Sequence, residues 1–267
     1  PPEHAAFLTR AAGTNNIGVS AQFVPVLAAV EDEVVAAFQH GRGVPYSSYQ
    51  RFHEVMAEES GQTVLSVLNS HILPLEPSLV ERLEAGIDVV DIGCGQGRAV
   101  NLLAQTFPRS RFRGFDLCQE TVEAAEREAR ARGITNASFV ACDVSQWSDV
   151  EGYDLITAFD AIHDQGQPAQ VLANIQRALR ADGLFLMQDI AGSSHVHHNI
   201  GRPLSPFVYT ISCMHCMSVS LAQGGVGLGA AWGREQAEAM LREAGFQRIR
   251  VEALEHDIMN YYYLARK

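Results

Sequence analysis

The sequence contains few basic residues for its length. Its 267 residues include 20 lysines and arginines against 31 aspartates and glutamates, which gives a formal net charge of −11 at pH 7. Nucleic acids bind proteins mainly through basic side chains that neutralise phosphates. This composition therefore argues against nucleic-acid binding through this stretch of chain.

Long apolar runs are absent from the sequence. A membrane-spanning helix needs about 20 consecutive apolar residues. No such run and no visible signal peptide occurs, so no membrane partner is expected. The chain starts at Pro1 and Pro2 without a methionine, so a truncated N-terminus, with a targeting segment upstream, stays open as an interpretation.

Cysteine is scarce and odd in number. Three of the five cysteines stand at predicted strand ends or turns, where free buried cysteines are common. Cys213 and Cys216 form a C-x-x-C pair, but the sequence has no second pair to complete a four-cysteine zinc site. We therefore expect a reduced protein of the cytoplasm.

One stretch, VVDIGCGQGR from Val89 to Arg98, organises the rest of the chain. Its pattern predicts a buried strand, a glycine-rich turn and then a helix. Gly93, Gly95 and Gly97 allow the backbone to approach a ligand closely, and the free N–H groups of the helix point into the turn. Such a turn on an open α/β sheet predicts a nucleotide-type cofactor.

Acids flank this turn and end the next two predicted strands. Asp91 could hold an ammonium group, while the amides of the turn take a carboxylate. Asp116 lies nineteen residues after Gly97, where a carboxylate can accept both hydroxyls of a ribose. Asp143 ends the third strand, where it can accept the adenine amino group while Val144 packs on the ring.

The turn does not follow the dinucleotide pattern G-x-G-x-x-G/A. Depending on the frame, Arg98 or Val100 stands where the third small residue is needed, and both are too bulky for close packing of helix on strand. A nicotinamide oxidoreductase is therefore the least favoured class of enzyme. A cofactor with an ammonium and a carboxylate fits better.

In motif order, the chain resembles the class I S-adenosylmethionine-dependent methyltransferases over roughly residues 86 to 267. The motifs are VVDIGCGQG, GFDLC, VACDV, YDLITAFDAIHD and LRADGLFLMQDI. The resemblance implies S-adenosyl-L-methionine as the cofactor and a small molecule as the methyl acceptor. The predicted cofactor-binding residues are Asp91, Gly93, Gly95, Gly97, Asp116, Leu117, Asp143, Val144 and Phe159.

The order of elements predicts the fold class. Strands and helices alternate after residue 86, which is typical of a doubly wound, mostly parallel α/β sheet. The last two strands follow each other without a helix and must pair antiparallel. We therefore expect seven strands with an antiparallel last strand, at residues 87–92, 111–116, 137–142, 153–159, 183–189, 246–253 and 258–265, with helices at 97–107, 119–132, 167–180 and 233–244.

The predicted domain organisation has two parts, the second of which carries an insertion. Residues 1–85 read as an all-helical subdomain, with helices at 1–41, 47–59, 62–71 and 78–83. The resemblance implies that this part contributes a homodimer contact and a wall of the substrate pocket. Residues 86–267 form the Rossmann-like methyltransferase domain. Residues 191–231 interrupt its alternation with a long irregular segment, which we interpret as a substrate lid.

The histidines supply the candidate catalytic groups. His163 and Asp164 follow the fourth predicted strand, and a histidine there could act as general base because its ordinary pKa lies near neutrality. Alternatively, His53, His163 and His215 could hold a divalent metal, iron or zinc, that stabilises an enolate. The run HVHH at 195–198 is more typical of a solvated loop.

Two groups of methyltransferases resemble the chain in more detail. The segment MHCMSVSLAQGGVGLGAAWG is similar to a group that carries an N-terminal winged-helix domain. The separation of 52 residues between His163 and His215 resembles that in metal-dependent α-keto acid C-methyltransferases. The leading hypothesis is methyl transfer to a small molecule, with metal-assisted α-keto acid methylation as its sharpest form. The alternative is a transcriptional regulator or sensor with a DNA-binding winged helix upstream.

Overall fold

The computed structural model describes residues 1–267, apart from the side chain of Thr14. Seven strands form one sheet in the order β3-β2-β1-β4-β5-β7-β6. β7 pairs antiparallel with β5 and β6, whereas the other pairs are parallel. The predicted fold class is confirmed. The strands are β1 (Asp88–Ile92), β2 (Arg111–Asp116), β3 (Ala137–Ala141), β4 (Tyr153–Phe159), β5 (Leu179–Ile190), β6 (Arg248–Leu254) and β7 (Asp257–Arg266).

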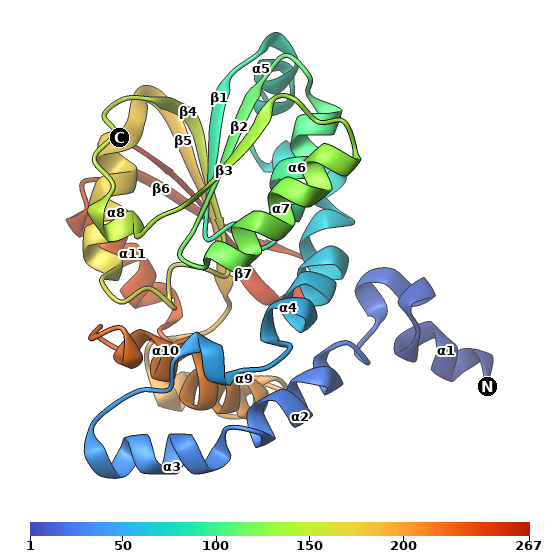
Figure 1. The fold of residues 1–267 in the computed structure, drawn as a ribbon, viewed down its shortest axis with the longest axis vertical. Helices are drawn as coiled ribbons and strands as arrows, with labels where there is room; N and C mark the ends of the chain where they lie inside the picture. Colours follow the sequence, from blue (N-terminus) through green and yellow to red (C-terminus); the bar gives the residue numbers. More distant parts are fainter.

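Helices cover both faces of the sheet because successive strand residues point to opposite sides. Val89 of β1 packs in the core beneath α5, α6 and α7, whereas its neighbour Val90 packs in the core beneath α8 and α11 (Figure 1). Both valines are almost fully buried. The covering helices are α5 (Leu79–Ala85), α6 (Arg98–Thr106), α7 (Gln119–Ala131), α8 (Pro168–Ala178) and α11 (Gly233–Glu243).

A second helical layer lies beyond the carboxyl ends of the parallel strands (Figure 1). It has a small core of its own, in which Phe23, Leu27 and Phe52 from the N-terminal part meet Val219 from the predicted lid. In the described part of the chain, no helix is both long and apolar enough to cross a membrane. The remaining helices are α1 (Pro2–Leu8), α2 (Phe23–Ala28), α3 (Glu31–His40), α4 (Phe52–Ser60), α9 (Ser205–Ile211) and α10 (Met217–Ala222).

The N-terminal part is helical as predicted, but its helices are shorter. The stretch expected as one helix over residues 1–41 is interrupted at Gly13, which has a positive φ of 58°. The side chain of Asn16 then accepts the N–H of Gly18 at 3.0 Å and holds a turn. The helix expected to begin near residue 47 begins at Phe52 instead, because Arg51 adopts a left-handed conformation with φ of 62°.

The predicted lid is more ordered than the sequence suggested. Residues 205–222 run as α9, a π-helical turn at Ser212–Cys216, and α10, before the glycine-rich loop. Phe207, Ile211 and Val219 recur at helical spacing and pack on the N-terminal helices, which explains why this stretch is helical. The lid and the N-terminal helices therefore form one cover over the sheet edge.

Candidate functional site

A cavity of about 910 Å³ lies between the carboxyl edge of the sheet and the helical cover. Its walls come from the glycine turn, the ends of β2, β4 and β5, α4, and the helices of the predicted lid. The structure brings ten of the predicted site residues to this cavity. They are His53, Asp91, Gly93, Gly95, Asp116, Leu117, Phe159, His163, Asp164 and His215.

The glycine turn has the backbone that its sequence requires. Gly93, Gly95 and Gly97 all have positive φ, between 52° and 69°. A side chain on Gly97 would meet Phe139 and the Cβ of Ala125, which would lie 2.5 Å from the added Cβ, whereas Gly95 faces open space. Gly97 thus serves packing of helix on strand, and Gly95 leaves the backbone open to a ligand.

Alanine at these two glycines separates the two roles. Gly97→Ala combines left-handed strain with a packing collision, so we expect the free energy of unfolding to fall by about 3 kcal/mol or more. Gly95→Ala has no neighbour to strike and should cost only about 1 kcal/mol. Urea denaturation of both variants measures the difference. Equal losses would contradict the assigned roles.

The carboxylate of Asp116 accepts three hydrogen bonds at the turn. Its Oδ2 accepts the N–H of Gly95 at 2.8 Å, and its Oδ1 accepts the N–H of Cys118 at 2.9 Å and the hydroxyl of Thr121 at 3.1 Å. These donors fix the carboxylate at the cavity wall. A carboxylate has about four acceptor positions, so it keeps capacity for a ligand hydroxyl.

Asp91 lies deeper, beneath the turn. It is buried, and its Oδ1 accepts the hydroxyl of Thr157 at 2.6 Å. Burial raises the pKa of Asp91 to about 7, although the hydrogen bond from Thr157 acts in the opposite direction. A cationic ligand group at this end of the cavity would favour the ionised form.

The structure places three predicted cofactor residues away from the cavity wall. Gly97 lies behind the turn in the packing described above. Asp143 is exposed at the end of β3, where its Oδ1 accepts the N–H of Ser145 at 2.9 Å. Val144 is buried in the core beside Trp147. An adenine contact by Asp143 and Val144 stays a prediction.

His163 is buried at the end of β4 and held from both sides. Its Nδ1 lies 2.7 Å from Oδ1 of Asp189, and its Nε2 lies 3.3 Å from Oδ1 of Asp164. Burial alone lowers the pKa of His163, but the two carboxylates outweigh burial and hold that pKa well above its usual value. The near-neutral pKa assumed from the sequence therefore does not describe this histidine, because it sits between two acids.

Asp189 is a functional candidate that sequence reasoning missed. Its fully buried Oδ1 accepts three N–H groups, from the ring of His163, the indole of Trp232 at 2.9 Å, and the backbone of Ile190 at 2.8 Å. Asp189 is the penultimate residue of β5, in the motif MQDI, so the rule that selected acids at strand ends could have found it. It fixes the orientation of the His163 ring.

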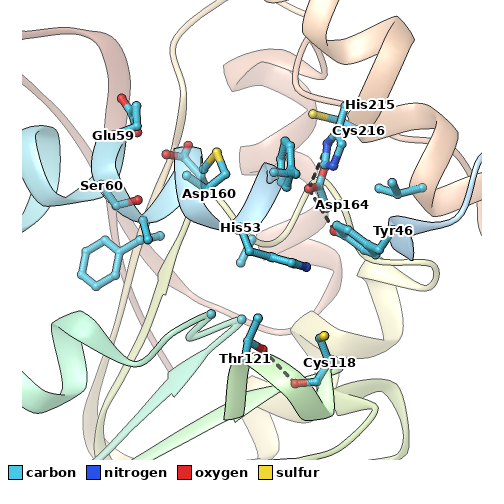
Figure 2. Close-up of a pocket in the computed structure, with 18 of the residues that line it drawn as sticks. Tyr46, His53, Glu59, Ser60, Cys118, Thr121, Asp160, Asp164, His215 and Cys216 are labelled. Carbon is cyan, nitrogen blue, oxygen red and sulfur yellow. Dashed lines mark hydrogen bonds and ion pairs between the residues drawn. The ribbon is translucent and has the colours of Figure 1, made fainter. Parts of the chain in front are cut away.

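Asp164 and its neighbours Tyr46 and His215 form one side of the cavity, the acceptor side (Figure 2). Oδ2 of Asp164 accepts the hydroxyl of Tyr46 at 3.2 Å and lies 3.8 Å from Nδ1 of His215. Oδ1 has only the ion-pair contact with Nε2 of His163 at 3.3 Å and no further hydrogen-bond partner among the described residues. Figure 2 shows these side chains on one side of the pocket, opposite Glu59 and Asp160.

The π-helical turn Ser212–Cys216 carries two consecutive residues into this region. His215 is fully buried and stacks on Phe52, with ring centroids 3.6 Å apart, and neither ring nitrogen has a partner among the described residues. Burial lowers its pKa to about 4. Cys216 is also buried, and burial raises the pKa of its thiol to about 12.

The structure gathers a different set of possible metal ligands from the predicted one. Ligand atoms of His163, Asp164 and Cys216 all lie within 4.8 Å of one another. His215 is adjacent to this group through Asp164, whereas His53 stacks on Tyr46 with ring centroids 5.7 Å apart. A site built from the three predicted histidines stays a prediction.

A family model described as a methyltransferase domain matches residues 83–255, well over half of the chain. The chain belongs to the methyltransferase domain family. Its sheet order is that of a class I S-adenosylmethionine-dependent methyltransferase, for which S-adenosylmethionine is the cofactor. The predicted family is confirmed.

Known members of the methyltransferase family align with parts of the chain. A malonyl-[acyl-carrier protein] O-methyltransferase of Paenibacillus sp. is 26% identical over 52% of this chain and 53% of its own length. A trans-aconitate 2-methyltransferase of Acidovorax sp. is 30% identical over 44% of this chain and 43% of its own. The chain thus spans about half the length of these curated relatives.

A solved methyltransferase-fold structure covers the whole chain. The structure entitled PigF with SAH matches 100% of this chain and 78% of its own, with a TM-score of 0.69 and 16% identity. At this identity the match establishes the shared fold, including the helical N-terminal part.

Proposed function

We propose that this protein transfers a methyl group from S-adenosylmethionine to a small molecule. One juxtaposition carries the proposal: the His163–Asp164 pair and the glycine turn with Asp116 line the same cavity. A cofactor bound at the turn would therefore lie beside the acidic–histidine pair. Titration calorimetry with S-adenosylhomocysteine tests the proposal, and no detectable binding up to millimolar concentration would contradict it.

The chemistry is an in-line displacement at the sulfonium methyl. The acceptor atom forms a bond to the methyl carbon while the carbon–sulfur bond breaks and sulfur keeps the electron pair. The acceptor proton passes to the His163–Asp164 pair, in which Asp164 would take it, because the pKa of His163 is held well above its usual value and the ring already carries a proton. Asp189 holds the His163 ring so that Nε2 faces Asp164. The enclosed cavity orients the two reactants.

The pKa of Asp91 predicts a pH dependence of cofactor binding. An unfolded aspartate titrates near pH 3.9, whereas burial raises the pKa of Asp91 to about 7. The free folded protein therefore retains a proton in this window, loses stability as pH rises through it, and must release the proton to bind an ammonium group. We expect affinity for S-adenosylhomocysteine to rise up to about tenfold per pH unit between pH 5.5 and 7.

Calorimetry across this pH range measures the slope. Asp91→Asn should flatten it. Glu59, whose pKa burial also raises to about 7, provides the matched control Glu59→Gln. An unchanged slope in Asp91→Asn, or a slope lost only in Glu59→Gln, would assign the titration to a different carboxyl.

A metal-assisted form of the reaction is the second candidate. The donor set fits a divalent ion, since His163, Asp164 and Cys216 offer nitrogen, oxygen and sulfur ligands. Asp189 supplies the carboxylate that metal-bound histidines usually have behind them. A bound iron or zinc ion would polarise an acceptor oxygen, which α-keto acid C-methylation requires. Elemental analysis of tag-free protein and of His163→Ala decides whether a metal is held there.

We also propose that the helical N-terminal part supplies a contact between two copies of the chain, as well as one wall of the pocket. α3 exposes Val35 and Phe38, the latter to 74%, on a face without a partner among the described residues. Exposed large apolar side chains in one patch are typical of protein interfaces. Sedimentation analysis measures the state of assembly. The regulator hypothesis concerns a DNA-binding segment upstream, and DNA binding by a longer chain would support it.

A further inference from the structure

We infer that the methyl acceptor is a positively charged amine and not a carboxylic acid. This inference rests on the proposed function and adds the substrate class. It follows from the charges that line the cavity. The lining acids are Glu54, Glu59, Asp91, Asp116, Glu120, Asp160 and Asp164, whereas the lining lysines and arginines are Arg51, Arg98 and Arg127.

None of these three arginines lies free in the depth of the cavity. Arg98 is exposed and donates to the backbone oxygen of Ala57 at 2.7 Å. The side chain of Arg51 is 57% exposed and lies 3.5 Å from Glu54, and Arg127 is similarly exposed beside a glutamate of its own helix. The one lysine of the sequence is the last residue. A carboxylate acceptor would therefore find no guanidinium or ammonium inside.

The lining acids lie on two sides of the cavity. S-adenosylmethionine carries a sulfonium, an ammonium and a carboxylate, so it brings a single net positive charge. Asp91 and Asp116 lie at the glycine turn, where that charge would be placed. Asp160 and Asp164 lie on the other side of the cavity, and Glu59 beside Asp160 (Figure 2). Burial raises the pKa of Asp160 well above its usual value and that of Glu59 to about 7, so Asp164 is the carboxylate on this side that can meet a cationic acceptor.

The two histidines of the acceptor side supply no free cation for a carboxylate. His163 lies between two carboxylates, 3.3 Å from Asp164 and 2.7 Å from Asp189, so two acids stand against one histidine. The nearest acid to His215 is Asp164, whose Oδ2 lies 3.8 Å from Nδ1. Neither ring nitrogen of His215 has a hydrogen-bond partner among the described residues, and a neutral ring offers one of them as an acceptor that an N–H group could satisfy.

Aromatic side chains surround these acceptors. Tyr46 donates to Asp164 and stacks on His53, while Tyr49 and Phe52 flank the ring of His215. Aromatic faces attract cations and exclude hydrated carboxylates. In the reaction, the bound ammonium gives one proton to Asp164. The freed lone pair forms the nitrogen–carbon bond as the carbon–sulfur bond breaks, leaving a methylammonium product and neutral sulfur.

Matched probe pairs test the inference on the whole chain saturated with S-adenosylhomocysteine. The pairs are benzylamine and phenylacetate, phenethylamine and 3-phenylpropionate, and tryptamine and indole-3-propionate, titrated at pH 7.5 by calorimetry. We expect at least one amine to bind roughly tenfold or more tightly than its carboxylate. Asp164→Asn should reduce that preference to about threefold or less, whereas Asp149→Asn, an exposed acid outside the cavity lining, should preserve it.

The outcomes separate this inference from the proposed function. If S-adenosylhomocysteine binds but no amine of the panel binds more tightly than its carboxylate, the inference is overturned and the proposed function stands. A preference for carboxylates that chelation abolishes would likewise overturn it, in favour of the metal-assisted form. If S-adenosylhomocysteine itself does not bind, the proposed function fails.

Discussion

Replacing His163 by alanine is expected to lower kcat for methyl transfer by about 10²- to 10⁴-fold, the usual contribution of a positioned acid–base group. His163 is buried between Asp164 and Asp189, so its loss leaves two carboxylates without their shared donor. Asp164, which takes the proton of the acceptor, is then no longer held in place by the histidine ring. Single-turnover formation of S-adenosylhomocysteine with a working acceptor measures the effect.

The control for this variant is His195→Ala, an exposed histidine outside the cavity lining. It should change kcat by less than about twofold. Affinity for S-adenosylhomocysteine should stay within a few-fold in His163→Ala, because the hydrogen bonds between Asp116 and the glycine turn do not involve that histidine. A variant that turns over at the normal rate would remove His163 from the mechanism, and a variant that loses the cofactor would assign it to binding.

Asn in place of Asp116 is expected to weaken S-adenosylhomocysteine binding by about 10²-fold or more. The carboxylate accepts the N–H groups of Gly95 and Cys118 on its two oxygens, and an amide would turn its own N–H group toward one of them. Two charge-assisted hydrogen bonds, one to the turn and one to the ligand, are each worth about tenfold or more in affinity. Calorimetry measures the loss.

Asp182→Asn is the matched control, since this exposed aspartate lies in β5, outside the cavity lining. Its affinity for S-adenosylhomocysteine should equal that of the unmodified chain. The thermal unfolding temperature of both variants should be measured beside the affinity. Tight binding by Asp116→Asn would show that the cofactor is held elsewhere in the cavity.

The sheet and the cofactor end of the site follow from local sequence. Each central strand is a short apolar run, and the acid that ends it falls at the carboxyl edge because parallel strands end together. Asp91 and Asp116 could therefore be placed from the sequence alone. The glycines of the turn are equally predictable from the sequence, because positive φ and close packing both require glycine there.

The acceptor end depends on contacts between distant residues. Trp232 and Asp189 are separated by 43 residues and meet only in the fold. His215 and Cys216 enter the site together because a π-helical turn changes the direction of successive side chains. The hydrophobic periodicity of the sequence does not predict such a turn. Tyr46 lies in a short turn before α4. Arg51, the residue directly before α4, adopts a left-handed conformation, which the sequence does not reveal because the residue is not a glycine. The pocket wall was therefore less predictable than the cofactor turn.

The hydrogen bond from Trp232 to Asp189 constrains how the cavity can open. Trp232 directly follows the lid, and its indole shares one carboxylate oxygen with the ring of His163. Withdrawing that end of the lid would remove one of the three donors of the buried oxygen that orients the ring. The entrance for the acceptor is therefore to be sought at the opposite end of the lid, and residues there can be varied to change the access route without altering proton transfer.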